Sequence, residues 1–232
     1  MTSSLVGSEM CIRDRLAGTR IIPLVIEEEK MKTVKAQTME LTGGKPILEL
    51  KPFHHKNVGI VTTGNEVFHG RIQDTFTPVI VDKLSEFDTE VIDHVTWDDD
   101  DKKVTASILD MIEKGADIVI CTGGMSVDPD DKTPLAIKNT GARIVSYGAP
   151  VLPGAMFLLA YYDRMARGKN RRTVIMGLPG CVMYAKRTIF DLVLPRVMAD
   201  VPVTKADLAK MGAGGLCLNC PTCIFPNCGF GK

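Results

Sequence analysis

The sequence predicts an α/β fold, a three-layer α/β/α sandwich around a mainly parallel sheet, followed by a small cysteine-rich tail. From Asn57 onward, short apolar runs that suit buried strands alternate with amphipathic stretches that suit helices. This alternation is typical of parallel sheets covered by helices on both faces. Loops with glycine and threonine follow three of the apolar runs, at the strand ends where such sheets bind ligands. Four of the seven cysteines fall within residues 217–228, which sets that segment apart.

Hydrophobic periodicity places the individual elements. The expected strands cover residues 58–62, 90–95, 117–121, 142–146, 156–161 and 173–176. The expected helices begin at Pro78, include Val104 to Ile112, begin at Pro134 and run from Val182 to Val193. In the first helix Ile80, Leu84 and Phe87 share one face, as in an amphipathic helix. Gly115 follows the second helix and is expected to end it.

The pattern divides the chain into four parts, residues 1–15, 16–56, 57–200 and 201–232. The first part has no periodicity, and we expect a non-native remnant or a disordered tail. The second part contains expected strands at 18–26 and 46–50 and a helix at 27–39, too little to make a core. We expect it to be a remnant of, or a connector to, an upstream domain. The third part is the α/β domain, and the fourth is a hinge with the cysteine tail.

Composition excludes several classes of function. Lysine plus arginine and aspartate plus glutamate both number 28, so the chain lacks the basic excess that nucleic-acid binding requires. The basic run at 164–172 lies between two expected strands and is interpreted as a solvated turn. No apolar run approaches the roughly 20 residues of a membrane span, and no signal peptide is evident. Scattered and clustered cysteines suit a reducing compartment, so we expect a cytoplasmic protein.

The segment from Cys121 to Pro134 is the most informative loop. Gly123 and Gly124 follow a buried strand and allow the backbone to approach a ligand closely. Thr133 is the expected N-cap of the next helix, and Pro134 suits its first position. Because a helix N-terminus attracts anions, this order of residues indicates a place to hold a phosphate. The loop matches neither a Walker A motif nor a dinucleotide fingerprint, so alone it indicates only a small phosphate-bearing ligand.

Carboxylates near this loop indicate a cation. Asp74, Asp98, Asp130 and Asp131 would repel a phosphate unless a divalent metal such as Mg²⁺ lay between them. Most of the run from Asp98 to Asp101 is interpreted instead as a solvated loop that caps the following helix.

Four motifs occur in a fixed order along the chain. They are residues 62–67 (Thr-Thr-Gly-Asn-Glu-Val), Asp74 before a proline-containing helix, residues 122–127 (Thr-Gly-Gly-Met-Ser-Val) with Asp131, and residues 177–180 (Gly-Leu-Pro-Gly). This series resembles the molybdopterin-binding domain of molybdenum cofactor biosynthesis proteins, the molybdotransferase and adenylyltransferase group to which gephyrin belongs. The resemblance covers roughly Asn57 to Ala199.

The resemblance implies that the chain binds molybdopterin and acts in cofactor biosynthesis. In the molybdotransferase branch, molybdate enters the dithiolene of adenylylated molybdopterin and AMP is released, with a divalent cation such as Mg²⁺ assisting. Asp131 and Asp74 match the functional aspartates. The implied ligand-binding residues are Thr63, Gly64, Glu66, Thr122, Gly123, Gly124, Ser126, Lys132, Gly177, Pro179 and Gly180. The resemblance also implies a homo-oligomer. A molybdoenzyme or another cofactor-biosynthesis protein is a further expected partner.

The chain departs from the family pattern in ways that bear on catalysis more than on binding. Asp128 stands where the family usually has glycine, and Thr75 and Phe76 replace the serine and asparagine that usually follow Asp74. Cys181 follows the Gly-Leu-Pro-Gly motif in place of asparagine and is interpreted as a small hydrophobe. Two alternatives therefore stay open: a non-enzymatic carrier or sensor of the cofactor, and a pyrophosphatase-like relative that acts on a nucleotide.

The tail carries Cys217, Cys220, Cys223 and Cys228, separated by two, two and four residues. Such density in a reducing compartment indicates four thiolates on one metal centre, either an iron–sulfur cluster or a structural zinc. The alternative is a disordered tail with free thiols, which are prone to oxidation. Residues 211–215 precede the cysteines as an expected hinge. The tail indicates a redox or metal-sensing branch, or docking to a metalloenzyme.

Overall fold

The computed structural model describes residues 25–126, 128, 131–166 and 168–232, and the chain forms two units, residues 1–52 and 53–232. In the first unit, helix α1 (Glu28–Thr42) confirms the expected helix and ends at Gly43, whose φ of 59° is left-handed. The strand expected at 46–50 is wrong, because no described strand lies there to pair with it. The strand expected at 18–26 falls mostly outside the described residues.

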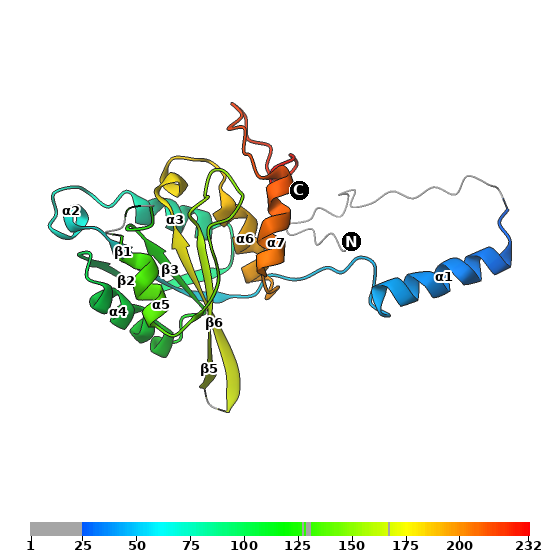
Figure 1. Cartoon of the computed structure of the whole chain (residues 1–232), viewed down its shortest axis with the longest axis horizontal. Helices are drawn as coiled ribbons and strands as arrows, with labels where there is room; N and C mark the ends of the chain where they lie inside the picture. Colours follow the sequence, from blue (N-terminus) through cyan, green and yellow to red (C-terminus); the bar gives the residue numbers. More distant parts are fainter. Residues whose placement is uncertain (1–24, 127, 129–130, 167) are drawn as a thin grey trace. The chain divides into compact units, whose positions relative to one another are not determined.

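The second unit is built on a six-stranded sheet with the order β2-β1-β3-β6-β5-β4 (Figure 1). The strands are β1 (Lys56–Thr63), β2 (Thr89–Trp97), β3 (Ile118–Thr122), β4 (Arg143–Tyr147), β5 (Leu158–Ala166) and β6 (Lys169–Leu178). The pairs β1–β2, β1–β3 and β3–β6 are parallel, and β5 runs antiparallel to both of its neighbours. The mainly parallel sheet is therefore confirmed. The basic run at 164–172, expected as a turn, lies mostly within β5 and β6, which are longer than predicted.

Helices cover both faces of this sheet, which gives the expected three layers (Figure 1). Successive residues of a strand face opposite sides, so Ile60 packs with the core that contains Ile80 and Phe190, and Val61 packs with the core that contains Ile108. The helices of the second unit are α2 (Asn65–Phe68), α3 (Phe76–Leu84), α4 (Asp101–Lys114), α5 (Thr133–Asn139), α6 (Ile189–Met198) and α7 (Lys205–Met211). Within the described part of the chain, no helix is long and apolar enough to cross a membrane.

Local hydrogen bonds set the helix boundaries. The Asp100 carboxylate accepts from the amides of Lys102 and Lys103 and caps α4, as expected, and Gly115 ends it with a φ of 105°. The helix expected from residue 182 is wrong at its start. Residues Gly180–Met183 form a short 3₁₀ helix, η1, and α6 begins only after Thr188, which forms a capping box with Asp191.

The cysteine segment, residues 216–230, packs against the rest of the second unit. After a short 3₁₀ turn, η2 (Gly212–Gly214), the backbone of Leu216 forms a bridge with that of Leu152. Near the end of the chain, Phe230 is 5% exposed and joins the core on the α6 side of the sheet. The segment is therefore attached at both of its ends.

Candidate functional site

The loops that follow β1, β3 and β6 meet at one edge of the sheet. The register pairs Thr62 with Thr122, and Thr122 with Leu178, so the three strands end side by side. Gly123, with a φ of 80°, lies so close to the β1 loop that a Cβ atom would stand 2.0 Å from the Thr63 carbonyl oxygen. A Cβ atom on Gly177 would stand 2.6 Å from Cε of Met125. Direct contact therefore joins all three loops, as the expected site requires.

A buried hydroxyl fixes two of these loops together. Thr133 was expected to cap α5, but the N-cap is Lys132 and Thr133 is already helical. The Thr133 hydroxyl instead donates to the Gly123 carbonyl oxygen at 2.9 Å and lies 3.1 Å from Oγ1 of Thr63. The capping expectation is wrong because the helix already includes Thr133, and the Thr133 hydroxyl connects the helix to the preceding loop instead.

Ser126 and Asp131 form the polar end of the site. The Ser126 hydroxyl donates to Oδ2 of Asp131 at 2.7 Å, and the Ser126 amide donates to the same oxygen. The Tyr147 hydroxyl donates to the Ser126 carbonyl oxygen at 3.0 Å. Burial, with a further contribution from the Asp131 charge, raises the pKa of Tyr147, so its phenol stays protonated at neutral pH. Two donors of Ser126 thus converge on one anionic oxygen.

Asp130, the neighbouring acid that was also expected near the phosphate, lies outside the described residues.

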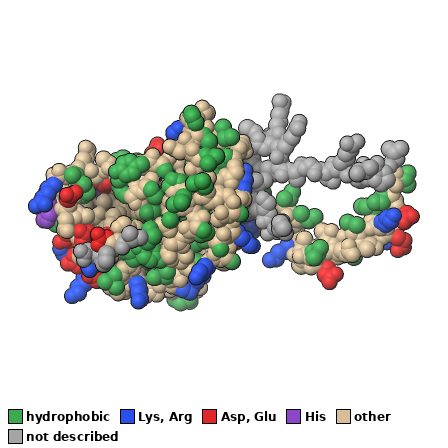
Figure 2. Space-filling model, turned by 45° about the horizontal axis from the view of Figure 1, so that its top comes forward, with side chains coloured by type: hydrophobic (Ala, Val, Ile, Leu, Met, Phe, Trp, Pro, Cys, Tyr) green, Lys and Arg blue, Asp and Glu red, His purple; other side chains and the backbone are tan. Residues whose placement is uncertain are grey.

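A shallow groove of about 520 Å³ runs from this polar end; we call it the rim groove. Its walls are mainly apolar and include Met125, Pro179, Gly180 and Cys181, together with residues 152–156, while Ser126 lies within it. Figure 2 shows hydrophobic side chains gathered on the visible face of the second unit, and Leu152, at the groove, is 56% exposed. Because pockets for small ligands combine apolar walls with a few polar groups, the groove suits a flat ligand with one anionic end.

Other predicted residues lie near the three loops but not on the rim groove. Thr63 and Thr122 are buried, and the Thr122 hydroxyl donates to Oγ1 of Thr62 at 3.3 Å. Gly64 begins the turn into α2, where Glu66 is exposed. Lys132 is half-buried at the start of α5. The structure therefore brings Ser126, Pro179 and Gly180 to one cavity and leaves these other residues around it.

Asp74 lies two residues before helix α3, whose N-cap position is Thr75, and its carboxylate accepts hydrogen bonds from the first turn of the helix. Its Oδ1 accepts from the amides of Phe76 and Thr77 at 2.8 and 3.0 Å, and its Oδ2 accepts from the Thr77 hydroxyl at 2.6 Å. Burial acts to raise the pKa of this carboxyl, but the Thr77 and Phe76 hydrogen bonds and the His94 charge outweigh it and lower the pKa. The carboxylate is thus ionised and occupied by the helix that it caps.

Sequence reasoning missed His94, which belongs to the Asp74 cluster. Nε2 of His94 lies 3.2 Å from the hydroxyl oxygens of both Thr62 and Thr77, and 3.7 Å from Oδ2 of Asp74. The available signal was a polar residue in β2, near its carboxyl end, beside a strand that ends in two threonines. That signal is weak, because the sequence does not show directly that β1 and β2 are neighbours in the sheet.

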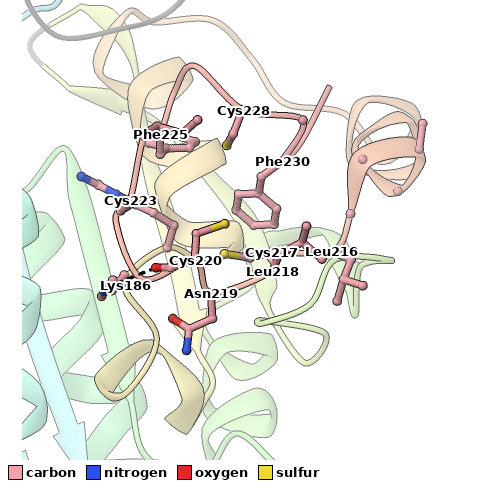
Figure 3. Close-up of a pocket in the computed structure, with 17 residues that line it drawn as sticks. Lys186, Leu216, Cys217, Leu218, Asn219, Cys220, Cys223, Phe225, Cys228 and Phe230 are labelled. Atoms are coloured by element: carbon pink, nitrogen blue, oxygen red, sulfur yellow. Dashed lines mark hydrogen bonds between the residues drawn. The ribbon is translucent and has the colours of Figure 1, made fainter.

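The four C-terminal cysteines line one pocket of about 370 Å³, together with Lys186 and Arg187 (Figure 3); we call it the thiol pocket. Cys220 and Cys223 are exposed, and Cys217 and Cys228 are half-buried. Among the described residues, no three histidine, cysteine or acidic side chains are already arranged to hold a metal ion. Cys217 and Leu216 line both the thiol pocket and the rim groove.

Comparison with known proteins identifies the family of the α/β domain. The family described as "Probable molybdopterin binding domain" matches residues 59–199, more than half of the chain. The chain belongs to this family. The resemblance that the four motifs indicated is therefore confirmed.

Individual relatives carry different names. A CinA-like protein of Mycobacterium tuberculosis is 37% identical over 75 residues, 32% of this chain and 17% of that protein. A molybdopterin adenylyltransferase of Pyrococcus furiosus is 27% identical over 135 residues, 55% of this chain and 79% of that protein. A molybdopterin molybdenumtransferase of Haemophilus influenzae is 27% identical over 167 residues, 69% of this chain and 39% of that protein. The chain thus spans only a small part of the CinA-like protein and less than half of the molybdenumtransferase.

Proposed function

We propose that this chain binds molybdopterin in the rim groove and holds the terminal phosphate of the pterin on the loop from Gly123 to Ser126. One observation carries the proposal: the amide and hydroxyl of Ser126 both donate to one carboxylate oxygen of Asp131. Donors that converge on a carboxylate oxygen can equally hold a phosphate oxygen, since both are anionic acceptors. The apolar walls of the groove suit the ring system, and membership of the family supports the choice of ligand.

The two carboxylates take different parts in this proposal. A phosphate on Ser126 displaces Asp131, whose carboxylate is then available to Mg²⁺, a hard cation that prefers oxygen ligands. Asp74 does not fit that role, because three donors from Phe76 and Thr77 already occupy its two oxygens. When bound, Mg²⁺ would neutralise phosphate charge during transfer. Asp131 is the residue of this chain that would position it.

For the reaction we propose molybdotransferase-like chemistry, in which molybdate enters adenylylated molybdopterin and water cleaves the phosphoanhydride to release AMP. The relative named a molybdenumtransferase supports this reaction, but the relative named an adenylyltransferase is just as similar in identity. The alternative function is that of a carrier or sensor that binds the cofactor without turnover. The helix-capping role of Asp74 favours that alternative, since it leaves one carboxylate instead of two for chemistry.

The deciding experiment uses the purified full chain under anaerobic conditions. Molybdate-dependent release of AMP from adenylylated molybdopterin supports the transferase, and tight binding of molybdopterin without release supports the carrier. Hydrolysis of plain dinucleotides would support a pyrophosphatase-like function instead. Absence of molybdopterin binding in every assay overturns the proposal. Light scattering on the same sample tests the self-association that the family resemblance implies.

A second function, metal binding at the thiol pocket, is favoured by one observation: all four tail cysteines line the same cavity. We propose that they hold an iron–sulfur cluster or a zinc ion, since four thiolates are a common ligand set for both. Elemental analysis for iron, zinc and acid-labile sulfide after anaerobic purification tests this. Stoichiometric metal that is lost in Cys220→Ser is the expected result, and a protein with neither iron nor zinc would contradict it.

A further inference from the structure

We propose that the cysteine segment completes the rim groove, so that a metal bound by the four cysteines tightens the binding of the pterin ligand. This inference rests on the proposed function, because it concerns the same groove. The geometry that points to it is the position of Cys217 and Leu216, which line the thiol pocket on one side and the rim groove on the other. One short stretch of backbone is therefore a wall of both cavities.

Backbone hydrogen bonds attach this wall to the groove. The Leu152 amide donates to the Gly215 carbonyl oxygen at 2.6 Å, and the Cys217 amide donates to the Leu152 carbonyl oxygen at 2.8 Å. Leu152 itself lines the rim groove. A shift of the chain at Cys217 must therefore either move the groove wall at Leu152 or break the two hydrogen bonds that join them.

The middle of the cysteine segment is exposed from Leu218 to Ile224. Phe225 and Cys228 are half-buried against the core, and Phe230 is buried in it. Asn219 has a left-handed φ of 49°, which turns the chain between Cys217 and Cys220. With its two ends fixed and its middle open to solvent, this loop can draw its thiolates together on a metal while Cys217 stays at the groove.

Charge around the thiol pocket favours a thiolate centre. Four thiolates on one metal carry a net negative charge, and two cations line the pocket. Lys186 donates to the carbonyl oxygen of Pro221 at 3.1 Å, and Arg187 stacks on Phe225 at 5.0 Å from the ring centroid. Both cations contact the cysteine segment. The Arg187 guanidinium also pairs with Glu86 and Asp191, so the charge that opposes the thiolates comes mainly from Lys186.

Thermodynamic linkage requires that the metal and the pterin change each other's affinity equally. If metal raises the affinity for the pterin, the pterin must raise the affinity for metal by the same factor. A metal bound to Cys217 would add a restraint to the wall that Leu216 and Cys217 form, and restraining that wall before the ligand arrives removes part of the ordering cost of binding. We expect about a tenfold change in each direction, within the usual range for coupled sites.

The test measures binding of molybdopterin to the full chain, anaerobically, by pterin fluorescence. One sample is stripped of metal, one is loaded with Zn²⁺ and one is reconstituted with iron and sulfide. Metal-loaded protein should bind molybdopterin about tenfold more tightly than stripped protein, and saturating molybdopterin should lower the dissociation constant of the metal by the same factor. The zinc and iron arms distinguish which centre produces the effect.

Three variants distinguish the effect of the groove wall on molybdopterin binding from the effect of the bound metal. Cys223 lines only the thiol pocket. The Cys223→Ser variant should therefore lose the metal and, with it, the metal-dependent increase in affinity for molybdopterin. Thr222→Ser, at the neighbouring exposed position, is the matched control and should behave as the native chain does. Leu216→Ala should keep the metal but weaken molybdopterin in both metal states, because its side chain lines the groove.

The outcomes distinguish this inference from the proposed function. Equal molybdopterin affinity with and without metal overturns the coupling and leaves the proposed function intact. Failure of the native chain to take up zinc or iron also overturns the coupling. Failure to bind molybdopterin in any metal state overturns the proposed function, and the inference with it.

Discussion

The two carboxylates that the sequence assigns to one task are held in different ways at the end of β1. Asp74 hydrogen-bonds to the amides of its own helix α3 and, through Oδ2, lies beside Thr62. Asp131 hydrogen-bonds to Ser126 on a loop that is tied to Thr63 through Gly123. Thr62 and Thr63 are adjacent in a strand, so they face opposite sides of the sheet. The two acids thus belong to separate clusters.

This difference determines which hydrogen-bond donors a ligand can take over. The amides that Asp74 accepts from belong to the first turn of α3, and α3 needs them capped whether or not a ligand is bound. The donors that Asp131 accepts from are exposed on a loop, where another anion can replace the carboxylate. We therefore infer that Asp74 supports the fold and that Asp131 belongs to the exchangeable part of the site.

The largest expected effect is on catalysis and concerns Asp131→Ala. If the protein is a transferase, molybdate-dependent AMP release should fall by about 1,000-fold, equivalent to about 4 kcal/mol on the barrier, because the residue that positions the cation is lost. The free energy of unfolding should change by less than about 1 kcal/mol, since the lost hydrogen bonds are on an exposed loop. Steady-state AMP release together with urea unfolding checks both. Unchanged release would remove Asp131 from the catalytic proposal.

The next largest effect is on stability and concerns Asp74→Ala. The free energy of unfolding should fall by about 2–3 kcal/mol, because α3 loses its cap and a charge-assisted hydrogen bond from Thr77. Urea unfolding followed by the fluorescence of Trp97, the single tryptophan, measures this. Asp74→Ser is the matched control: serine can still cap the helix and should restore about half of the loss. Native stability in the alanine variant would contradict the structural role.

A smaller expected effect is the pH dependence of the stability that Asp74 contributes. The pKa of Asp74 is lowered in the folded chain, because the hydrogen bonds from Thr77 and Phe76 and the His94 charge outweigh burial, which acts to raise it. A lowered folded pKa gives stability that is present above the unfolded pKa of about 3.9 and is lost as pH falls through the folded value. The difference in unfolding free energy between native and Asp74→Ser should therefore be constant near pH 7 and shrink below about pH 4. A constant difference down to pH 2 would show that the carboxylate charge has no part in capping.

The strands, the layers and the loop of Gly123 and Gly124 were predictable because each depends on neighbours in the sequence. Alternation of apolar runs placed β1 and β3, and two adjacent glycines marked the loop that contacts Thr63. The absence of a strand at 46–50 was not predictable by the same means, because an alternating run becomes a strand only where a partner strand pairs with it.

The missed features depend on contacts between distant residues. Lys83 and Asp191 form a buried ion pair at 2.7 Å that joins α3 to α6, yet they lie 108 positions apart in the chain. The hydroxyl of Thr133 looked like a helix cap in the sequence, but it bonds to Gly123 across the loop. The contact between Cys217 and the rim groove likewise joins a tail to a loop near Leu152. Sequence periodicity carries no information on such pairs.

The smallest expected effect concerns Tyr147→Phe, which removes one neutral hydrogen bond from the Ser126 end of the site. The phenol donates to the Ser126 carbonyl oxygen and holds the loop without touching the proposed phosphate donors. Because Tyr147 is partly exposed, the lost bond should cost about 0.5 kcal/mol, which is about a twofold weaker affinity for molybdopterin. Fluorescence titration measures it, with Tyr184→Phe, at a position 84% exposed, as the control. A loss of affinity of about tenfold or more in Tyr147→Phe would show that the position of the loop contributes more to binding than one hydrogen bond allows, and would contradict the view of Ser126 as an exposed, exchangeable donor.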